Sequence, residues 1–284
     1  MGLRIRTNVA SLSAQRQMAS TTKALNDSMD KLSSGYRINK ASDDAAGLGI
    51  SERIKANLGS LGQAKRNASD GISMVQVAEG GMNEVSNILI RLRELSTQAA
   101  SDTIGDRDRD FSNREYTQLV DEVDRISNSL DFNGIKLFKG ADAGLQSASI
   151  HVGSGDGSAP NSDTIQLDIE GMEISSEKLA LGTGEEITTR EGAAEKLSII
   201  DTALSNVASL RATMGAKQSR LNSSINNLAI SFENQTAANS RIRDVDFAAE
   251  VANSSQNRIM AQSGISVLSQ ANSIPEMAIS LIRG

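Results

Sequence analysis

LSSGYRINKASDDAAGLGI is the sequence of Leu32–Ile50, and it joins two long helical patterns. Gly35 suits the end of the first helix, because glycine adopts the left-handed C-cap conformation freely. Ser42 suits the start of the second helix, since its hydroxyl can accept a hydrogen bond from a free backbone N–H. The two aspartates that follow it would face the positive end of the helix dipole. The stretch therefore predicts a helix that ends near Tyr36, a short linker through Ala41, and a new helix.

Both flanks of this linker carry long helical patterns. Upstream, mainly apolar residues recur at alternating spacings of four and three, as in the seam of a coiled coil. They are Met18, Thr22, Leu25, Met29, Leu32 and Tyr36. Downstream, an apolar face continues to about Ser101, and seven glycines interrupt it. Because each glycine costs about 1 kcal/mol relative to alanine in a helix, the residues favour a break at Asp70-Gly71, unless glycine is kept there for close helix contacts.

The middle of the chain is more varied. A polar turn at Ser101–Asp110 precedes a third apolar seam, which predicts a helix over Asp110–Ser129. Asn133-Gly134 is a strong turn signal, and Gly140–Gly184 is rich in Gly, Ser, Asp and Thr. The strands predicted in this region, from its turn signals and period-two alternation, are Ile135–Phe138, Ser149–Val152 and Ile165–Ile169.

Helical patterns return in the C-terminal third of the chain. Arg190–Glu233 has the most regular heptad pattern, and a last seam runs over Met260–Leu281. A polar stretch at Ser240–Asp246 separates them, and Pro275 would kink the last helix or interrupt its regular hydrogen bonding. We therefore predict a mainly α fold: a long antiparallel helical rod with coiled-coil-like seams, plus a small β-hairpin region in the middle of the chain.

Composition excludes several kinds of chemistry. The 284 residues include no cysteine, no tryptophan and one histidine, His151, and the net charge is −6. Thiolate nucleophiles, disulfides and thiolate metal sites are excluded, and the negative charge disfavours nonspecific nucleic-acid binding. The alternating aspartates from Asp106 to Asp110 look like the start of a calcium loop, but Phe111 occupies the position of the required glycine. We predict no enzymatic activity, no cofactor, no metal site and no nucleic-acid partner.

No segment predicts a membrane span or a cleaved signal peptide. Met1–Arg6 is not followed by the apolar core of a signal peptide, and no apolar run approaches the ~20 residues of a membrane span. Function must then reside in the helical seams. A chain that runs out, turns and runs back pairs its two ends, and such a pair cannot bury its thin apolar stripes alone. Neighbouring copies should complete them, and contacts that do not close generate a filament.

Leu32–Ile50 closely resembles the N-terminal signature of bacterial flagellins, and Ser254–Gly284 resembles the matching C-terminal end. The resemblance covers about Met1–Gly140 and Thr189–Gly284. It implies one long helix through the glycine-containing segment, in a structural subunit that polymerises into the flagellar filament for swimming motility. It also implies paired helices of the inner filament core at residues 1–42 and 241–284, an outer helical rod domain at 43–134 and 190–240, and a short variable β/loop segment at 135–189.

The same resemblance implies partners and a location. Many copies would form a homopolymer, secreted through the flagellar export apparatus into the extracellular filament. An export chaperone would bind the C-terminus, and filament cap and hook-junction proteins would meet the subunits at the filament ends. The predicted assembly seam consists of Leu25, Met29, Leu32, Val267, Ala271, Ile274 and Leu281.

Ile90–Thr97 is similar to the helix of flagellins that activates the Toll-like innate receptor of animal hosts. The residues that match the dominant family contacts are Arg91, Leu95 and Glu115. Leu95 would be an apolar anchor, and Arg91 and Glu115 would offer charge-assisted hydrogen bonds around it. Leu95 also fits the apolar seam of its own helix, whereas Arg91 lies beside that seam.

Two other interpretations stay open. A hook–filament junction protein shares the flagellin ends, although such proteins are generally less similar to flagellins than this chain is. A cytosolic coiled-coil adaptor would not need the Leu32–Ile50 signature, and it would dimerise rather than polymerise.

Overall fold

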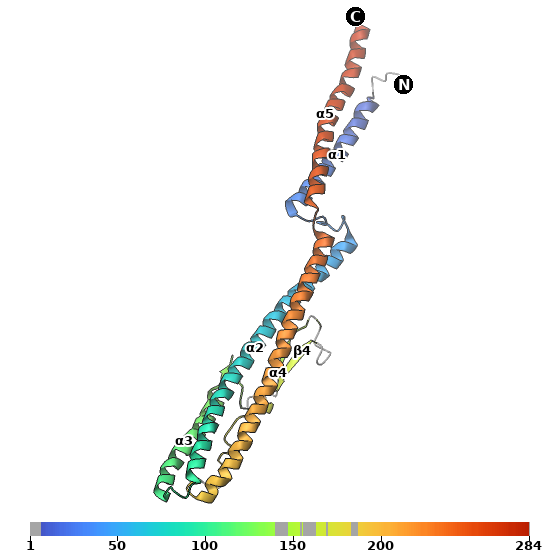
Figure 1. Cartoon of the computed structure of the whole chain (residues 1–284). Helices are drawn as coiled ribbons and strands as arrows, with labels where there is room; N and C mark the ends of the chain where they lie inside the picture. Colours follow the sequence, from blue (N-terminus) through green and yellow to red (C-terminus); the bar gives the residue numbers. More distant parts are fainter. Residues whose placement is uncertain are drawn as a thin grey trace. The chain divides into compact units, whose positions relative to one another are not determined.

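The computed structural model describes residues 7–139, 147–153, 155, 163–168, 170–182 and 187–283. Within these residues the chain is mainly helical (Figure 1). The helices are α1 (Val9–Ser34), α2 (Ala45–Ala99), α3 (Asp106–Ser129), α4 (Arg190–Arg243) and α5 (Phe247–Arg283), with a short 3-10 helix η2 (Glu170–Met172). The strands pair antiparallel, β1 (Asp131–Phe132) with β2 (Ile135–Lys136) and β3 (Ser147–His151) with β4 (Thr164–Asp168). The predicted fold class, mainly α with a small β region, is confirmed.

The described chain forms two compact units. One unit comprises the residues up to Ala56 and those from Asn234 onward, and the other comprises Asn57–Glu233. The long helices α2 and α4 each contribute to both units. The three-part division expected from the resemblance, with borders near residues 42, 134, 189 and 240, stays a prediction.

The end of α1 follows the sequence prediction. Gly35 adopts φ 75°, and its N–H donates to the Lys31 carbonyl at 2.9 Å. Only glycine takes this left-handed conformation without steric cost, so the helix stops there.

The predicted start of the second helix is wrong by two residues. The helix α2 begins at Ala45, and the Asp44 carboxylate accepts a hydrogen bond from the Gly47 N–H at 2.8 Å. Asp44 is therefore the capping residue in place of Ser42, which lies in the preceding turn. Asp43 does not face the helix but binds the linker: its Oδ2 accepts from the backbone N–H groups of Asn39 at 3.0 Å and Lys40 at 2.9 Å.

The helix α2 is continuous through all seven glycines, so the one long helix implied by the resemblance is confirmed and the break considered at Asp70-Gly71 is wrong. Two of the glycines leave room for neighbouring side chains. A Cβ at Gly71 would collide with Ile150 of β3, and a Cβ at Gly81 would lie 2.7 Å from both the Leu130 Cδ2 and the Phe138 Cε2. The close contacts made possible by glycine at these positions offset its low helix propensity.

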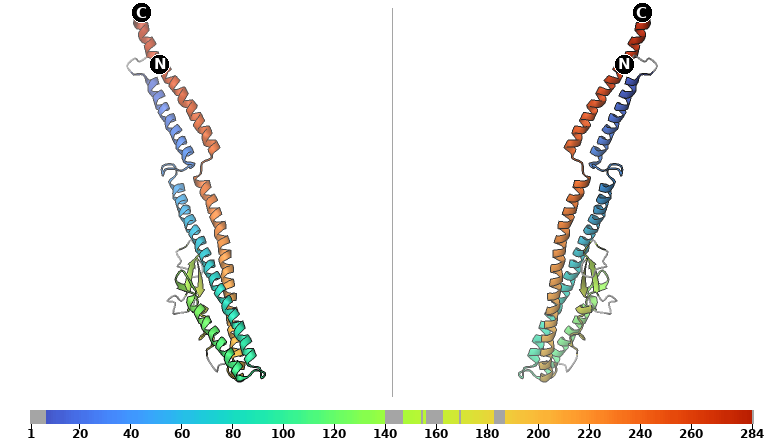
Figure 2. Two further views of the ribbon diagram at one scale, coloured as in Figure 1. Left: turned by 90° about the vertical axis from the view of Figure 1, so that its left-hand side faces the viewer. Right: turned by 90° about the vertical axis from the view of Figure 1, so that its right-hand side faces the viewer.

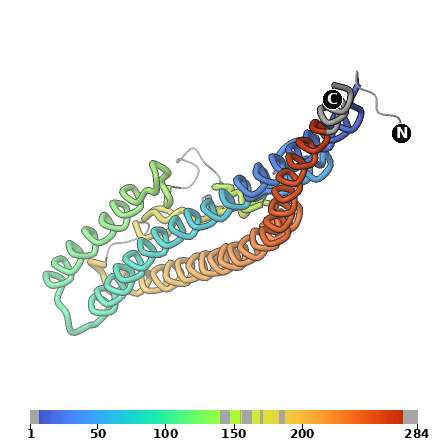
Figure 3. Tube along the Cα trace, turned by 90° about the horizontal axis from the view of Figure 1, so that it is seen from above, coloured from blue at the N-terminus to red at the C-terminus, as the bar shows by residue number. Residues whose placement is uncertain are grey.

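The core of the Asn57–Glu233 unit lies among α2, α3 and α4. Figures 2 and 3 show α2 and α4 side by side, and the ion pair of Arg93 with Asp201 at 2.7 Å joins the two antiparallel helices. The apolar seams predicted for the three helices meet here. The most completely buried side chains of this core include Met82, Leu89, Leu92, Phe138, Ile174 and Ile200.

Arg109 closes the turn between α2 and α3. Its guanidinium donates to the carbonyls of Ala99 at 2.8 Å and Ser101 at 3.0 Å, and its side chain is buried. Ala99 is the last residue of α2 and Ser101 lies two residues beyond it. Backbone carbonyls at the end of a helix lack intrahelical partners, so the Arg109 guanidinium satisfies them. The helix α3 accordingly begins at Asp106 rather than at the predicted Asp110, because the turn is shorter than its polar composition indicated.

The short strands match the sequence signals in place but not in length. Asn133 and Gly134 adopt φ 52° and 82°, so the turn predicted there is confirmed as a tight hairpin between β1 and β2. The strand predicted over Ile135–Phe138 ends at Lys136, since Leu137 and Phe138 are buried in the core instead. The other two predicted strands correspond to β3 and β4, and the predicted last residue, Ile169, lies outside the described residues.

The C-terminal helices are longer than expected. The helix α4 does not end at Glu233 but continues to Arg243, and the predicted polar stretch shrinks to the residues from Asp244 to Asp246. The helix α5 continues through Pro275. A helix can continue through polar residues when its opposite face packs against a partner. The predicted end of α4 at Glu233 was wrong because it was based on polarity alone.

Gly80 and Gly81 provide a matched pair for testing the packing of α2. We predict that Gly81→Ala lowers the free energy of unfolding by about 1–3 kcal/mol, because the new methyl must displace Leu130 and the buried Phe138 ring. Gly80 has no atom within reach of an added Cβ, so Gly80→Ala should raise the free energy by up to about 1 kcal/mol. Urea unfolding of the monomer measures both, and equal effects of the two substitutions would contradict this account.

The linker should depend on pH through Asp43. The N–H groups of Lys40 and Asn39 hold the pKa of the Asp43 carboxyl below its ordinary value. A folded pKa below the unfolded one means that the ionised group stabilises the linker at neutral pH, and that this stabilisation is lost as the pH falls through the folded pKa. We expect a carboxyl carbon titration by NMR to show Asp43 titrating lower in folded protein than in urea. Coincident titrations would refute the assignment.

Candidate assembly interface

The first unit contains an antiparallel pair of helices, α1 and α5, which lie side by side in Figures 1 and 2. The Asn8 amide donates to the Ala271 carbonyl at 2.7 Å, and the Ser11 hydroxyl donates to the Asn272 side-chain oxygen at 2.8 Å. One hydrogen bond from a side chain to the backbone and one between two side chains therefore hold this end of the pair.

The buried face of this pair is made of small and polar residues. Ser11, Thr21, Ser28 and Ala271 are 5–7% exposed. Among the described residues of α1 and α5, no large apolar side chain is buried. Since burial of large apolar side chains provides most of the stability of a helix pair, this pair is weakly stabilised by itself.

Nine large apolar side chains of α1 and α5 are instead exposed. They are 40–67% exposed, and they are Val9, Leu12, Met29, Phe247, Val251, Ile259, Met260, Ile265 and Val267. Single exposed apolar residues are ordinary, but nine on one pair of helices indicate an interaction surface.

The predicted assembly-seam residues are spread over both faces. Leu25 and Leu32 are half-buried, Met29 and Val267 are exposed, and Ala271 is buried. The side chains of Ile274 and Leu281 lie outside the described residues. The face of α1 that meets α5 passes through Thr21 and Ser28, one position before the Thr22 and Met29 of the predicted seam. Their part in assembly stays a prediction.

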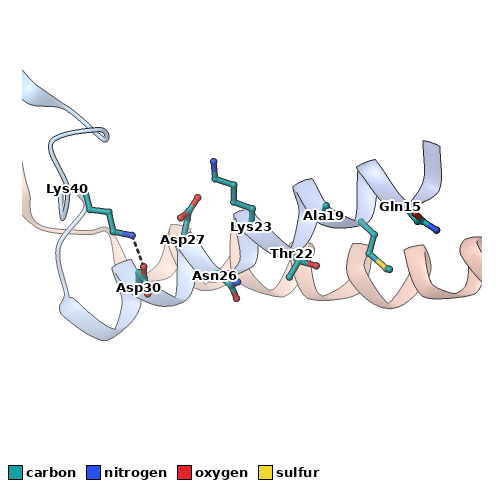
Figure 4. A pocket seen from close by; sticks show the side chains of 9 residues that line it. Gln15, Ala19, Thr22, Lys23, Asn26, Asp27, Asp30 and Lys40 are labelled. Atoms are coloured by element: carbon teal, nitrogen blue, oxygen red, sulfur yellow. Dashed lines mark hydrogen bonds and ion pairs between the residues drawn. The ribbon is translucent and has the colours of Figure 1, made fainter. Parts of the chain in front are cut away.

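A second surface of α1 is charged. A shallow groove of about 640 Å³ lies on this surface, and Lys40 binds Asp30 there at 3.1 Å. Figure 4 shows this ion pair with Lys23 and Asp27 on the same helix face. The hydrogen bond to Asp30 raises the pKa of the Lys40 amine. The groove differs from the apolar surface because four charged side chains line it together with Met18 and Ala19, and Lys40 and Asp30 form an ion pair there.

The two linkers of this unit are joined by a small β-bridge that the sequence did not reveal. Tyr36 pairs with Asp244, and the Arg37 N–H donates to the Arg243 carbonyl at 2.7 Å. The Arg243 guanidinium lies 4.8 Å from the centre of the Tyr36 ring and 2.6 Å from the Glu52 carboxylate. At the end of α4, Arg243 therefore contacts the first linker through the Tyr36 ring and α2 through its ion pair with Glu52. Its position in a polar stretch offered no signal, since the partners come from distant parts of the sequence.

The structure brings together two of the three predicted receptor-contact residues. The Arg91 guanidinium binds the Glu115 carboxylate at 2.8 Å, across from α2 to α3, and Glu94 at 2.9 Å. These hydrogen bonds, led by that to Glu115, raise the pKa of Arg91. Leu95 is 3% exposed and belongs to the core, as its place in the seam indicated.

Among the described residues, no group of three or more acidic, histidine or cysteine side chains could hold a metal ion, and none of the helices is long and apolar enough to span a membrane. His151 lies in β3, where its carbonyl accepts a hydrogen bond from the Asn67 amide at 3.0 Å. Burial raises the pKa of Tyr116 to about 12, and buried Lys196 donates to the Leu181 carbonyl at 2.8 Å, which suits structural roles.

Comparison with known proteins identifies the helical regions at both ends of the chain. Residues 5–143 match the family model described as bacterial flagellin N-terminal helical region, and residues 197–282 match bacterial flagellin C-terminal helical region. A flagellin of Halalkalibacterium halodurans is 40% identical over 276 residues, which are 97% of this chain and 98% of that protein. A flagellin of Bacillus subtilis is 37% identical over 309 residues, covering 99% of this chain and all of that one.

The chain is also similar to a solved flagellin structure. The crystal structure of Bacillus cereus flagellin matches 57% of this chain and 88% of its own, with 31% identity and a TM-score of 0.50. A putative flagellar hook-associated protein from Vibrio parahaemolyticus shares the fold alone, at 14% identity and a TM-score of 0.56. Neither the junction protein nor the adaptor is favoured by these findings. The chain belongs to the bacterial flagellin family and is a structural subunit of the flagellar filament, the organelle of swimming motility.

Proposed function

We propose that the exposed apolar surface of the α1–α5 pair is completed by neighbouring copies when this flagellin polymerises. The observation that carries the proposal is the distribution of side chains on this helix pair. Serine and threonine are buried between the helices, and nine large apolar side chains are exposed. Each large side chain that a neighbour covers contributes about 1.5–3 kcal/mol. In this proposal residues 1–42 and 241–284 form the inner core of the filament, residues 43–134 and 190–240 its outer rod, and residues 135–189 a variable segment.

The same surface accounts for the other flagellar partners that we propose. A subunit with an uncovered apolar surface needs protection before assembly, which is the task of an export chaperone at the C-terminus. Subunits at the two ends of a filament have uncovered contacts, which the cap and hook-junction proteins would cover. We propose that the chain reaches the extracellular filament through the flagellar export apparatus and acts there as a structural protein without a cofactor.

Deletion of Gln270–Gly284 tests the assembly role. It removes Ala271 and Asn272, which bind Asn8 and Ser11 of α1. We expect the truncated protein to form no filaments, because the pair is weakly stabilised and loses these bonds, while the core of the Asn57–Glu233 unit remains folded. Electron microscopy after seeding measures filament yield, and circular dichroism of the helices is the control. The same deletion should weaken chaperone binding.

Filaments at the normal yield would contradict the assembly role of this end of the chain. Loss of the helical signal well beyond the deleted residues would instead show that the Asn57–Glu233 unit depends on it. Normal chaperone binding by a truncated protein that does not polymerise would contradict the chaperone assignment alone.

We further propose that Arg91 and Glu115 contact the Toll-like innate receptor where the bacterium meets an animal host. Their ion pair is exposed, with 49% and 46% of the two side chains accessible. Leu95 is buried and would act by holding the helix in place. In this proposal only a monomer is recognised, because the same face is covered between subunits in a filament.

Arg93 provides a matched control for Arg91. Both arginines lie on α2 with half-exposed ion pairs, but Arg93 binds Asp201 of α4. We predict that Arg91→Ala monomer loses about tenfold or more of its activity in a receptor reporter assay, the range of an interface hot spot, while Arg93→Ala stays within about twofold. Leu95→Ala is unsuitable, since a core cavity costs about 2–5 kcal/mol. Silent wild-type monomer, or equal responses of the two variants, would contradict the assignment.

A further inference from the structure

A cavity of about 240 Å³ opens between α1 and α5. A water molecule occupies about 30 Å³ in the liquid, so the cavity has room for an aliphatic side chain. The residues that line this socket are Ala14, Gln17, Met18, Thr21, Met260, Ser263, Gly264 and Val267. None of them is charged. At Gly264 this socket has room for a side chain, since a Cβ there would come no closer than 3.9 Å to its nearest neighbour, Met18.

The same helix carries a side chain suited to such a socket. Ile259 is 67% exposed, the most exposed large apolar residue in the described part of the chain. Its neighbours one turn away on α5 are Ser255, Gln256, Gln262 and Ser263, all polar and uncharged. An apolar side chain inside a ring of uncharged polar groups has the composition of an interface anchor and its surrounding rim.

Ile259 does not face the socket of its own copy. Five residues along a helix correspond to about 140° around its axis, so Ile259 and Gly264 point to different faces of α5. A protruding side chain on one face and a matching hollow on another give a head-to-tail contact, and such contacts build open helical filaments when the rotation does not close.

We propose that Ile259 of one copy inserts into the Gly264 socket of a second copy. The proposal rests on the assembly role proposed above and names one contact within it. The other hollow on this unit, the groove in Figure 4, does not suit this occupant, because Lys23, Asp27, Asp30 and Lys40 line it and an aliphatic side chain would desolvate these charges. The uncharged socket carries no such cost.

A pair of complementary substitutions tests the contact. Gly264→Leu fills the socket from inside, and it favours the helix because leucine is a better helix former than glycine. Ile259→Ala removes the inserted side chain at an exposed position where folding does not depend on it. We expect each single variant to raise the critical concentration for seeded polymerisation about tenfold or more, the effect of losing several buried methylene groups.

The double variant Ile259→Ala with Gly264→Leu decides the pairing. An alanine can lie over a filled socket, so the double variant should polymerise at a lower critical concentration than either single variant. Additive losses in the double variant would overturn the pairing, and so would wild-type behaviour of both single variants. Failure of the wild-type protein to polymerise would overturn the assembly role, and this contact with it. Circular dichroism of the monomers confirms equal helix content.

Cross-linking gives a second measurement, since the chain contains no cysteine of its own. In filaments of Ile259→Cys with Val267→Cys, oxidation should produce a ladder of disulfide-linked subunits, because Val267 lines the socket. Monomers at the same concentration should give no ladder. The control Ile265→Cys with Val267→Cys pairs the socket with another exposed isoleucine of α5. A ladder of equal strength from the control would overturn the assignment of Ile259.

Discussion

The contact between α1 and α5 is the constraint on which the behaviour of this flagellin depends. Its buried face consists of Ser11, Thr21, Ser28 and Ala271, which contribute little apolar burial. Small residues let the two helices approach closely, and the large apolar side chains are consequently left on the outside. A pair arranged in this way gains its main stabilisation only when other molecules cover it. In the assembly proposed above, polymerisation therefore follows from the distribution of side-chain sizes between the two faces.

The Asn57–Glu233 unit has the opposite distribution. Large side chains such as Leu89, Leu92 and Phe138 are fully buried, and helix ends are satisfied internally, as by Arg109 at the end of α2. This unit has the core of an independently folded domain. The linkers of the first unit are held differently again, by the β-bridge of Tyr36 with Asp244 and by the contact of Arg243 with the Tyr36 ring. One apolar side chain of the first linker, Ile38, is also buried, at 2% exposure.

The sequence predicted the helices, the Gly35 cap and the Asn133-Gly134 turn, because these depend on local periodicity and on glycine conformation. It misplaced the features that depend on contacts between distant segments. Ser42 is a good capping residue, but Asp44 caps α2; Gly71 looks like a helix breaker, but Ile150 fills the space beside it. The assembly seam stays a prediction, since heptad spacing finds the apolar residues of α1 and cannot show which molecule covers an exposed one such as Met29. Arg243 gave no local signal at all.

The glycines within helices show how the two units differ. Each such glycine leaves space on the helix surface, and its effect depends on what occupies that space. At Gly71 and Gly81 the occupants are Ile150 and Phe138 of the same chain, so the glycines stabilise the fold of one copy. At Gly264 the space forms part of a cavity whose uncharged lining no side chain of the same copy fills. A position that lowers helix propensity without a compensating internal contact is explained when the missing contact comes from another molecule.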